Sequence, residues 1–173
     1  MDEALQLMIQ MNEGIWRRFK DGVADVTPEE VDWQPRPQAN TINAILRHLR
    51  IEAQWHLASL EHGAQSPYQD AASVQQLVVS VPLDFERNLR ELEDLYTRFL
   101  AGLRRTTLAA LQQQTVLFQV FPGGAPHSAD VLSYHQAVHL AIHLGQIRSI
   151  RNQYRRERGE PERFFPDNPT FPG

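Results

Sequence analysis

The sequence predicts an all-α fold, a bundle of four helices joined partly by long connections. Four segments repeat apolar residues at spacings of three and four, the periodicity of one face of an amphipathic helix. Proline, glycine and polar residues separate these segments, and no two stretches alternate convincingly as a pair of strands. The 173 residues suit one domain spanning 1–173, with a proline-rich coil tail at 158–173.

The first two predicted helices cover residues 2–21 and about 41–63. The proline-containing stretch between them is typical of a long connecting loop, and Asn40 or Thr41 can cap the second helix. Residues 64–82 form another long loop, which can carry the chain from one end of the bundle to the other. We therefore expect a crossover at 64–82 rather than a hairpin.

The third and fourth predicted helices cover about residues 83–104 and 129–156. Acidic residues early in the third helix and arginines at its end suit the helix macrodipole. Ser128 can cap the fourth helix, which is expected to stop near Gly159. Between the two helices, residues 111–124 hold at most a short extended segment ending at the Gly123–Gly124 turn, and we expect no sheet there.

Composition and charge argue against several classes of protein. The chain has 17 Lys and Arg against 21 Asp and Glu, so we expect no direct binding to nucleic acid. The absence of cysteine removes disulfides and thiolate ligands. The amino terminus is acidic and interrupted by polar residues, unlike a signal peptide, and no window approaches the roughly 18 apolar residues of a membrane span. We expect a cytoplasmic protein with no membrane partner.

The segment HQAVHLAIHLGQ, at residues 135–146, places three histidines four residues apart in the fourth helix. Each step of four turns the helix by only about 40° from the previous histidine, so the three share one face. Ile142 and Ile150 lie on the same face, which we therefore expect to point inward. Buried imidazoles need hydrogen bonds, water or a metal, although for one histidine alone a hydrogen-bonded core position is the commoner explanation.

Two histidines at positions i and i+4 can reach one cation at about 2.0–2.1 Å each, but a tight site needs a third ligand from another helix. The second helix offers His48 beside its apolar stripe, with His56 as a second candidate and His62 at the helix end. Glu52 lies one turn after His48. A metal site shared by the second and fourth helices is therefore the sharper hypothesis.

Two segments carry a resemblance to a known family. NTINAILRHLRIEAQWHL, at 40–57, resembles the second-helix signature of the DinB-like (YfiT-like) superfamily, and HQAVHLAIHLGQI, at 135–147, resembles its final-helix signature. VDWQP, at 31–35, matches the first loop. The resemblance implies an antiparallel four-helix bundle with long crossover connections and a divalent metal site.

The metal ligands implied by this resemblance are three histidines: His48, His139 and His143. His135 and Gln146 would lie just outside the ligand set, with Gln146 orienting a ligand or a bound water. Gly145, beside Gln146 in the motif, would let a neighbouring helix approach closely. Leu144 departs from the family, which commonly carries arginine at this position.

Three imidazoles leave an open coordination position, and both zinc and nickel suit such ligands. The ion would activate either water or a low-molecular-weight thiol. Glu52 is the candidate general base, the alternative being an exposed or salt-bridged glutamate. Arg148 and Arg151 are candidates for binding an anionic thiol cofactor, the alternative being surface ion pairs.

Three function classes stay open. The resemblance implies a metal-dependent enzyme acting on a small molecule, either a bacillithiol- or mycothiol-type S-transferase or a metal-dependent hydrolase. The superfamily also includes a maleylpyruvate isomerase that uses mycothiol. It also implies a homodimer. The alternatives are a non-catalytic small-molecule-binding protein with a structural metal, and a structural or stress-response partner protein.

Overall fold

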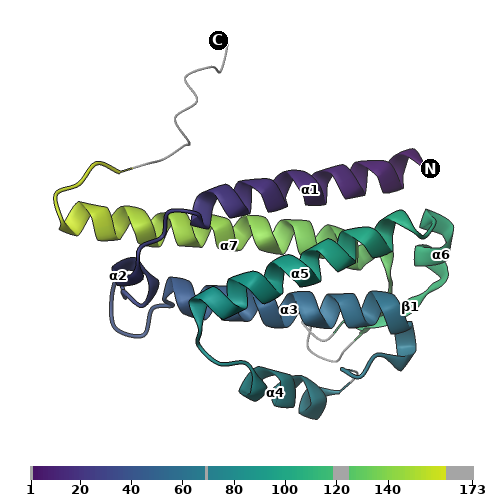
Figure 1. Cartoon of the computed structure of the whole chain (residues 1–173). Coiled ribbons are helices and arrows are strands. Elements are labelled where there is room, and N and C mark those ends of the chain that lie inside the picture. Colours follow the sequence, from purple (N-terminus) through teal and green to yellow (C-terminus); the bar gives the residue numbers. More distant parts are fainter. Residues whose placement is uncertain (1, 69, 119–124, 163–173) are drawn as a thin grey trace, which may run out of the picture.

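Four long helices form the bundle in the computed structural model, which describes residues 2–68, 70–118 and 125–162 (Figure 1). They are α1 (Glu3–Val23), α3 (Ile42–His62), α5 (Phe85–Arg104) and α7 (Asp130–Glu157). The predicted fold class, an all-α four-helix bundle, is confirmed. Thr41, one of the two expected caps, accepts a hydrogen bond at its side chain from the Ala44 amide at 3.0 Å and so begins α3.

The helices do not simply alternate in direction around the bundle. Two ion pairs join α3 to α5, Arg50–Glu91 and Glu61–Arg98. The residue numbers of the paired side chains increase in the same direction on both helices, so α3 and α5 run parallel. The polar contacts between α1 and α7 also follow the same order on both helices, so these two helices are parallel. Helices α3 and α7 run antiparallel (Figure 1). Two neighbouring parallel helices require the chain to return along the bundle between them, which is the crossover expected at 64–82.

That crossover contains a helix. The expectation of a loop throughout 64–82 is wrong, because after η1 (Gly63–Gln65) the residues Ala71–Ser80 form α4. Asp70 caps α4 by accepting a hydrogen bond from the Ser73 amide at 2.8 Å. Leu77 and Val81 then pack against Ile51 of α3, so tertiary contacts stabilise a helix of only 10 residues, too short to be recognised by periodicity.

Two further short helices and a hairpin occupy the other connections. They are α2 (Pro28–Val31), α6 (Leu108–Gln113), β1 (Thr115–Phe118) and β2 (Ala125–Ser128). The strands pair antiparallel with Thr115 opposite Ser128, so the expectation of no sheet is wrong. Ser128 ends a strand instead of capping α7, for which Ala129 is the N-cap. The predicted Gly123–Gly124 turn lies outside the described residues.

The core lies between the four long helices and includes a buried hydrogen-bond network. Tyr96 of α5 donates to Asn12 Oδ1 of α1 at 2.9 Å, and Asn12 Nδ2 donates to the Ser133 carbonyl of α7 at 3.0 Å. This network fixes α7, which carries six of the predicted site residues, relative to two other helices. Among the described residues, the largest fully buried apolar side chains are Phe19, Phe99, Leu5, Ile42, Leu46, Leu49, Leu92, Leu103, Leu111 and Leu132.

The carboxyl-terminal boundary follows the prediction closely in the part that is described. Helix α7 ends at Glu157, and Gly159 has a φ of 71°, a backbone conformation that glycine adopts without strain. Residues 163–173 of the predicted coil tail lie outside the described residues. Across the described ranges, no helix combines the length and the apolar character needed to cross a membrane.

Candidate metal centre

Helices α3 and α7 present potential metal-binding side chains to each other. On α3 and on α7 alike, three potential ligands follow at intervals of four residues, so each set lies along one helix face. Because the helices are antiparallel, the first ligand of one set meets the last two of the other. The six residues are His48, Glu52 and His56 on α3, and His135, His139 and His143 on α7.

The three histidines predicted as ligands come together. His139 Nε2 lies 3.0 Å from His48 Nε2 and 3.0 Å from His143 Nε2. The ring centroids of His48 and His143 are 4.9 Å apart. One ligand atom from each of the three lies within 4.8 Å of the others, so a single ion could be bound by all three.

The hydrogen bond on the far side of one ring fixes which nitrogen is available. Gln146 Oε1 lies 2.8 Å from His143 Nδ1, and an amide oxygen can only accept, so Nδ1 carries the proton. The lone pair of His143 is then on Nε2, the atom that faces His139. This is the tautomer that a metal bound through Nε2 requires.

The surroundings keep the imidazoles neutral, which is the form that binds metal. Burial, together with the nearby His143 and His48 rings, lowers the pKa of His139 to about 2. Loss of hydration beside the other rings lowers the pKa of His48 to about 4, again with a contribution from His143. The donor set therefore fits a divalent cation at neutral pH, without competition from protons.

The site lies at the rim of the bundle and not in its core. His48 is exposed, and His139 and His143 are half-buried. Ile142, expected to point inward with the histidines, is 55% exposed, so that expectation is wrong for this part of the helix face. Within the described part of the chain, no neighbouring helix approaches Gly145 either, since a Cβ there would meet nothing within 4 Å. An open rim leaves room for a substrate beside the ligands.

A second group adjoins the first on the same two helices. Glu52 Oε2 lies 3.7 Å from His56 Nε2, and His56 Nε2 lies 3.2 Å from His135 Nδ1. His56 is fully buried and bonds through Nδ1 to Gln136 Oε1. Gln136 is a site residue that the sequence did not reveal, because a polar residue in a helix gives no indication of facing a histidine 80 positions earlier.

Burial makes Glu52 a pH-sensitive residue. It raises the pKa of Glu52 to about 7. A carboxyl with a raised folded-state pKa contributes stability that is full below its unfolded pKa, near 4.5, and lost as the pH rises through 7. The glutamine of Glu52→Gln would not titrate, so only wild type should lose this stability as the pH rises. In metal-free protein, the free energy of unfolding of Glu52→Gln minus that of wild type should therefore increase by about 2 kcal/mol between pH 5 and pH 8.

Urea denaturation of both proteins in the presence of a chelator at the two pH values measures this growth. Titration of the histidines contributes to both proteins and largely cancels in the difference. A difference that stays constant with pH would show that Glu52 titrates normally.

The Gln146 contact gives a second prediction. Gln146→Leu removes the acceptor that holds the proton on His143 Nδ1, and loss of such a contact typically weakens metal binding about 10- to 100-fold. Competition with a chromophoric chelator measures the affinity for zinc. Gln146→Glu keeps an acceptor at the position and should retain most of the affinity. Equal affinities for wild type and Gln146→Leu would contradict the role.

The two arginines predicted to bind a thiol cofactor lie in different surroundings. Arg151 is 6% exposed and binds Asp25, which follows α1, and Glu30 of α2. The structure therefore does not bring Arg151 to the histidines. Arg148 is half-buried beside Gly145 in the wall of a cavity of about 430 Å³. Leu144 is buried against α1, where a Cβ on Gly22 would come within 2.5 Å of its Cδ1.

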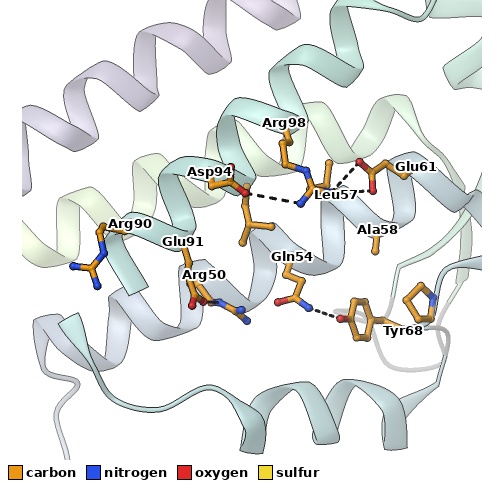
Figure 2. Close-up of a pocket in the computed structure, with 12 residues that line it drawn as sticks. Arg50, Gln54, Leu57, Ala58, Glu61, Tyr68, Arg90, Glu91, Asp94 and Arg98 are labelled. Carbon is orange, nitrogen blue, oxygen red and sulfur yellow. Dashed lines mark hydrogen bonds and ion pairs between the residues drawn. The ribbon is translucent and has the colours of Figure 1, made fainter. Parts of the chain in front are cut away.

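A cavity of about 560 Å³ lies elsewhere, between α3, α5 and Tyr68 (Figure 2). Its charged side chains are largely paired within the wall, Arg50 with Glu91 at 2.8 Å and Arg98 with Glu61 at 3.3 Å. None of the six potential ligands on α3 and α7 lines it. We therefore place the candidate chemistry at the histidines.

Comparison with known proteins agrees with this geometry. The family model of the DinB superfamily matches residues 11–147. Among solved structures, the chain is similar to YfiT from Bacillus subtilis, described as a probable metal-dependent hydrolase with an unusual four-helix bundle topology. The two share 18% identity and a TM-score of 0.68 over 93% of this chain and 91% of that chain, a likeness of fold. No curated protein matches the chain. Since the family model covers most of the sequence, including all three converging histidines, the chain belongs to the DinB superfamily.

Proposed function

We propose that this protein is a metal-dependent hydrolase of a small molecule, with His48, His139 and His143 as the ligands of one zinc or nickel ion. The observation that carries the proposal is the convergence of the three Nε2 atoms at an open rim of the bundle. A purely structural metal site is usually closed by four protein ligands, whereas a catalytic one keeps a position open. The name of YfiT supports the same class of reaction.

When bound, a divalent ion supplies Lewis acidity that favours ionisation of water or of a thiol near neutral pH. The chain's own residues provide the remaining functions. Gln146 holds the proton on His143 Nδ1 and so keeps Nε2 free. Glu52 accepts the proton that an attacking water releases, at a carboxylate whose pKa burial raises to about 7, close to the value best suited to a general base at neutral pH.

A thiol S-transferase is the second candidate, and Arg148 is the residue that favours it. This arginine follows the ligand His143 by five residues and lines the cavity of about 430 Å³ together with Asn152 and Arg156. Within the described residues it has no ion-pair partner within 4.0 Å. Its guanidinium could therefore bind a carboxylate of a low-molecular-weight thiol.

Reconstitution of tag-free, metal-free protein with zinc or nickel tests the proposal. Hydrolysis of a panel of small esters and amides should require the metal and should be lost in His48→Ala and His143→Ala while circular dichroism shows an intact fold. His62→Ala is the matched control, because His62 lies 55% exposed at the end of the same helix and should leave turnover unchanged.

The same assay separates the two candidates. Turnover that appears only when a thiol is added, and that falls in Arg148→Ala, would favour the S-transferase. Turnover that survives both chelation and His48→Ala would overturn the metal-dependent reaction altogether.

A further inference from the structure

The second group of ligands, Glu52, His56 and His135, is as closely gathered as the first. One ligand atom from each lies within 4.8 Å of the others. His56 is fully buried, and the Glu52 side chain is 16% exposed. Ring stacking joins the two groups, since His135 lies nearly parallel to His139 with centroids 5.0 Å apart and an interplanar angle of 18°.

The protons of this group leave one buried carboxylate oxygen without a donor. Because Gln136 Oε1 can only accept, His56 Nδ1 donates to it and the lone pair of His56 is on Nε2. His135 Nδ1, at 3.2 Å, can donate to that lone pair, so the neutral His56 ring has no proton to offer Glu52 Oε2 at 3.7 Å. Within the described residues, Glu52 Oε2 is buried and has no hydrogen-bond partner. A buried carboxylate oxygen without a donor requires either a proton of its own or a cation beside it.

We propose that Glu52, His56 and His135 form a second divalent cation site beside the three-histidine site. Two imidazoles and one carboxylate are a donor set found in catalytic zinc sites, and both helices already hold these side chains towards one another. Gln136 acts on His56 as Gln146 acts on His143, since each amide oxygen accepts from Nδ1 and so places the ring's lone pair on Nε2. The two sites are therefore built on the same plan.

One consequence rests on the proposed function, although the site itself does not. Glu52 is the carboxylate proposed to accept a proton from the attacking water. A carboxylate that binds a second cation is no longer free to accept that proton. Occupation of the second site should therefore inhibit hydrolysis, so that turnover falls as zinc exceeds one equivalent and this fall is absent in His135→Ala.

Zinc titration of tag-free, metal-free protein by isothermal calorimetry tests the site directly. Wild type and the control His62→Ala should each bind two equivalents. His48→Ala should keep one equivalent, and Glu52→Gln and His135→Ala should each keep one. Glu52→Gln changes the shape of the side chain very little, and circular dichroism confirms that each variant folds.

The outcomes separate this inference from the proposed function. A wild type that binds one equivalent, lost in His48→Ala but kept in Glu52→Gln and His135→Ala, would overturn the second site and leave the first intact. One equivalent kept in His48→Ala but lost in His135→Ala would support the second site and overturn the three-histidine site. No binding of zinc by wild type would overturn both.

Discussion

His139→Ala should weaken zinc binding at the three-histidine site by at least about 100-fold while the protein remains folded, because two imidazoles do not make a tight site. His139 is the central residue of the proposed ligand set. Its Nε2 lies 3.0 Å from those of both His48 and His143, whereas no hydrogen bond joins the latter two directly. Its loss therefore removes both close contacts of the group at once.

The measurement is a competition titration with a chromophoric chelator, in a Glu52→Gln background so that zinc bound by the second group does not contribute. His139 is half-buried at the rim, so its removal leaves no large cavity and circular dichroism should be unchanged. His62→Ala in the same background should bind zinc like its parent. An affinity for zinc that His139→Ala leaves within threefold of the parent would contradict the ligand assignment.

The convergence of two of the three proposed ligands could be predicted from the sequence because it depends on helical spacing. Residues four apart on one helix meet whatever the rest of the fold does, so the pair His139 and His143 needed only the assignment of a helix. The partner on the other helix, His48, was identified by resemblance to a family and not by periodicity. The structure then brings the three together.

Features that depend on contacts between distant segments could not be predicted in the same way. The contact of Gln136 with His56 requires a known register between α3 and α7. Pairing of β1 with β2 and packing of α4 on α3 are likewise tertiary effects, in which weak local preferences are overridden by burial. The surroundings of Arg151 could not be predicted for the same reason. Its spacing from Arg148 indicated that the two share a side of the helix, but not that Arg151 is buried against α1.

That burial makes Arg151 the residue whose loss should destabilise the fold most clearly. Arg151 Nε and Nη2 each donate to the Glu30 carboxylate at 3.1 Å. The guanidinium also donates to the carbonyls of Gly22 and Asp25 at 3.1 and 2.9 Å, where α1 ends and its last carbonyls lack helical partners. It therefore joins α7, the end of α1 and α2 at a single buried point.

Arg151→Met should lower the free energy of unfolding by about 3–5 kcal/mol, because it leaves the Glu30 carboxylate buried without its cationic partner. Urea denaturation measures the change. Arg156→Met is the matched control on the same helix. Its ion pair with Glu162 involves a side chain that is 64% exposed, and such exposed pairs contribute little to stability. Similar losses in the two variants would contradict the structural role of Arg151.

A double variant tests the physical reason for the loss. If an uncompensated buried charge causes it, then adding Glu30→Leu to Arg151→Met should recover much of the stability, because two apolar side chains can replace a buried ion pair. Glu30 also accepts from the Thr27 amide at 3.0 Å in the capping box of α2, so recovery should be incomplete by about the 1 kcal/mol that a capping contact contributes. A double variant less stable than Arg151→Met alone would instead show that the network's backbone contacts, and not the charge of Glu30, dominate.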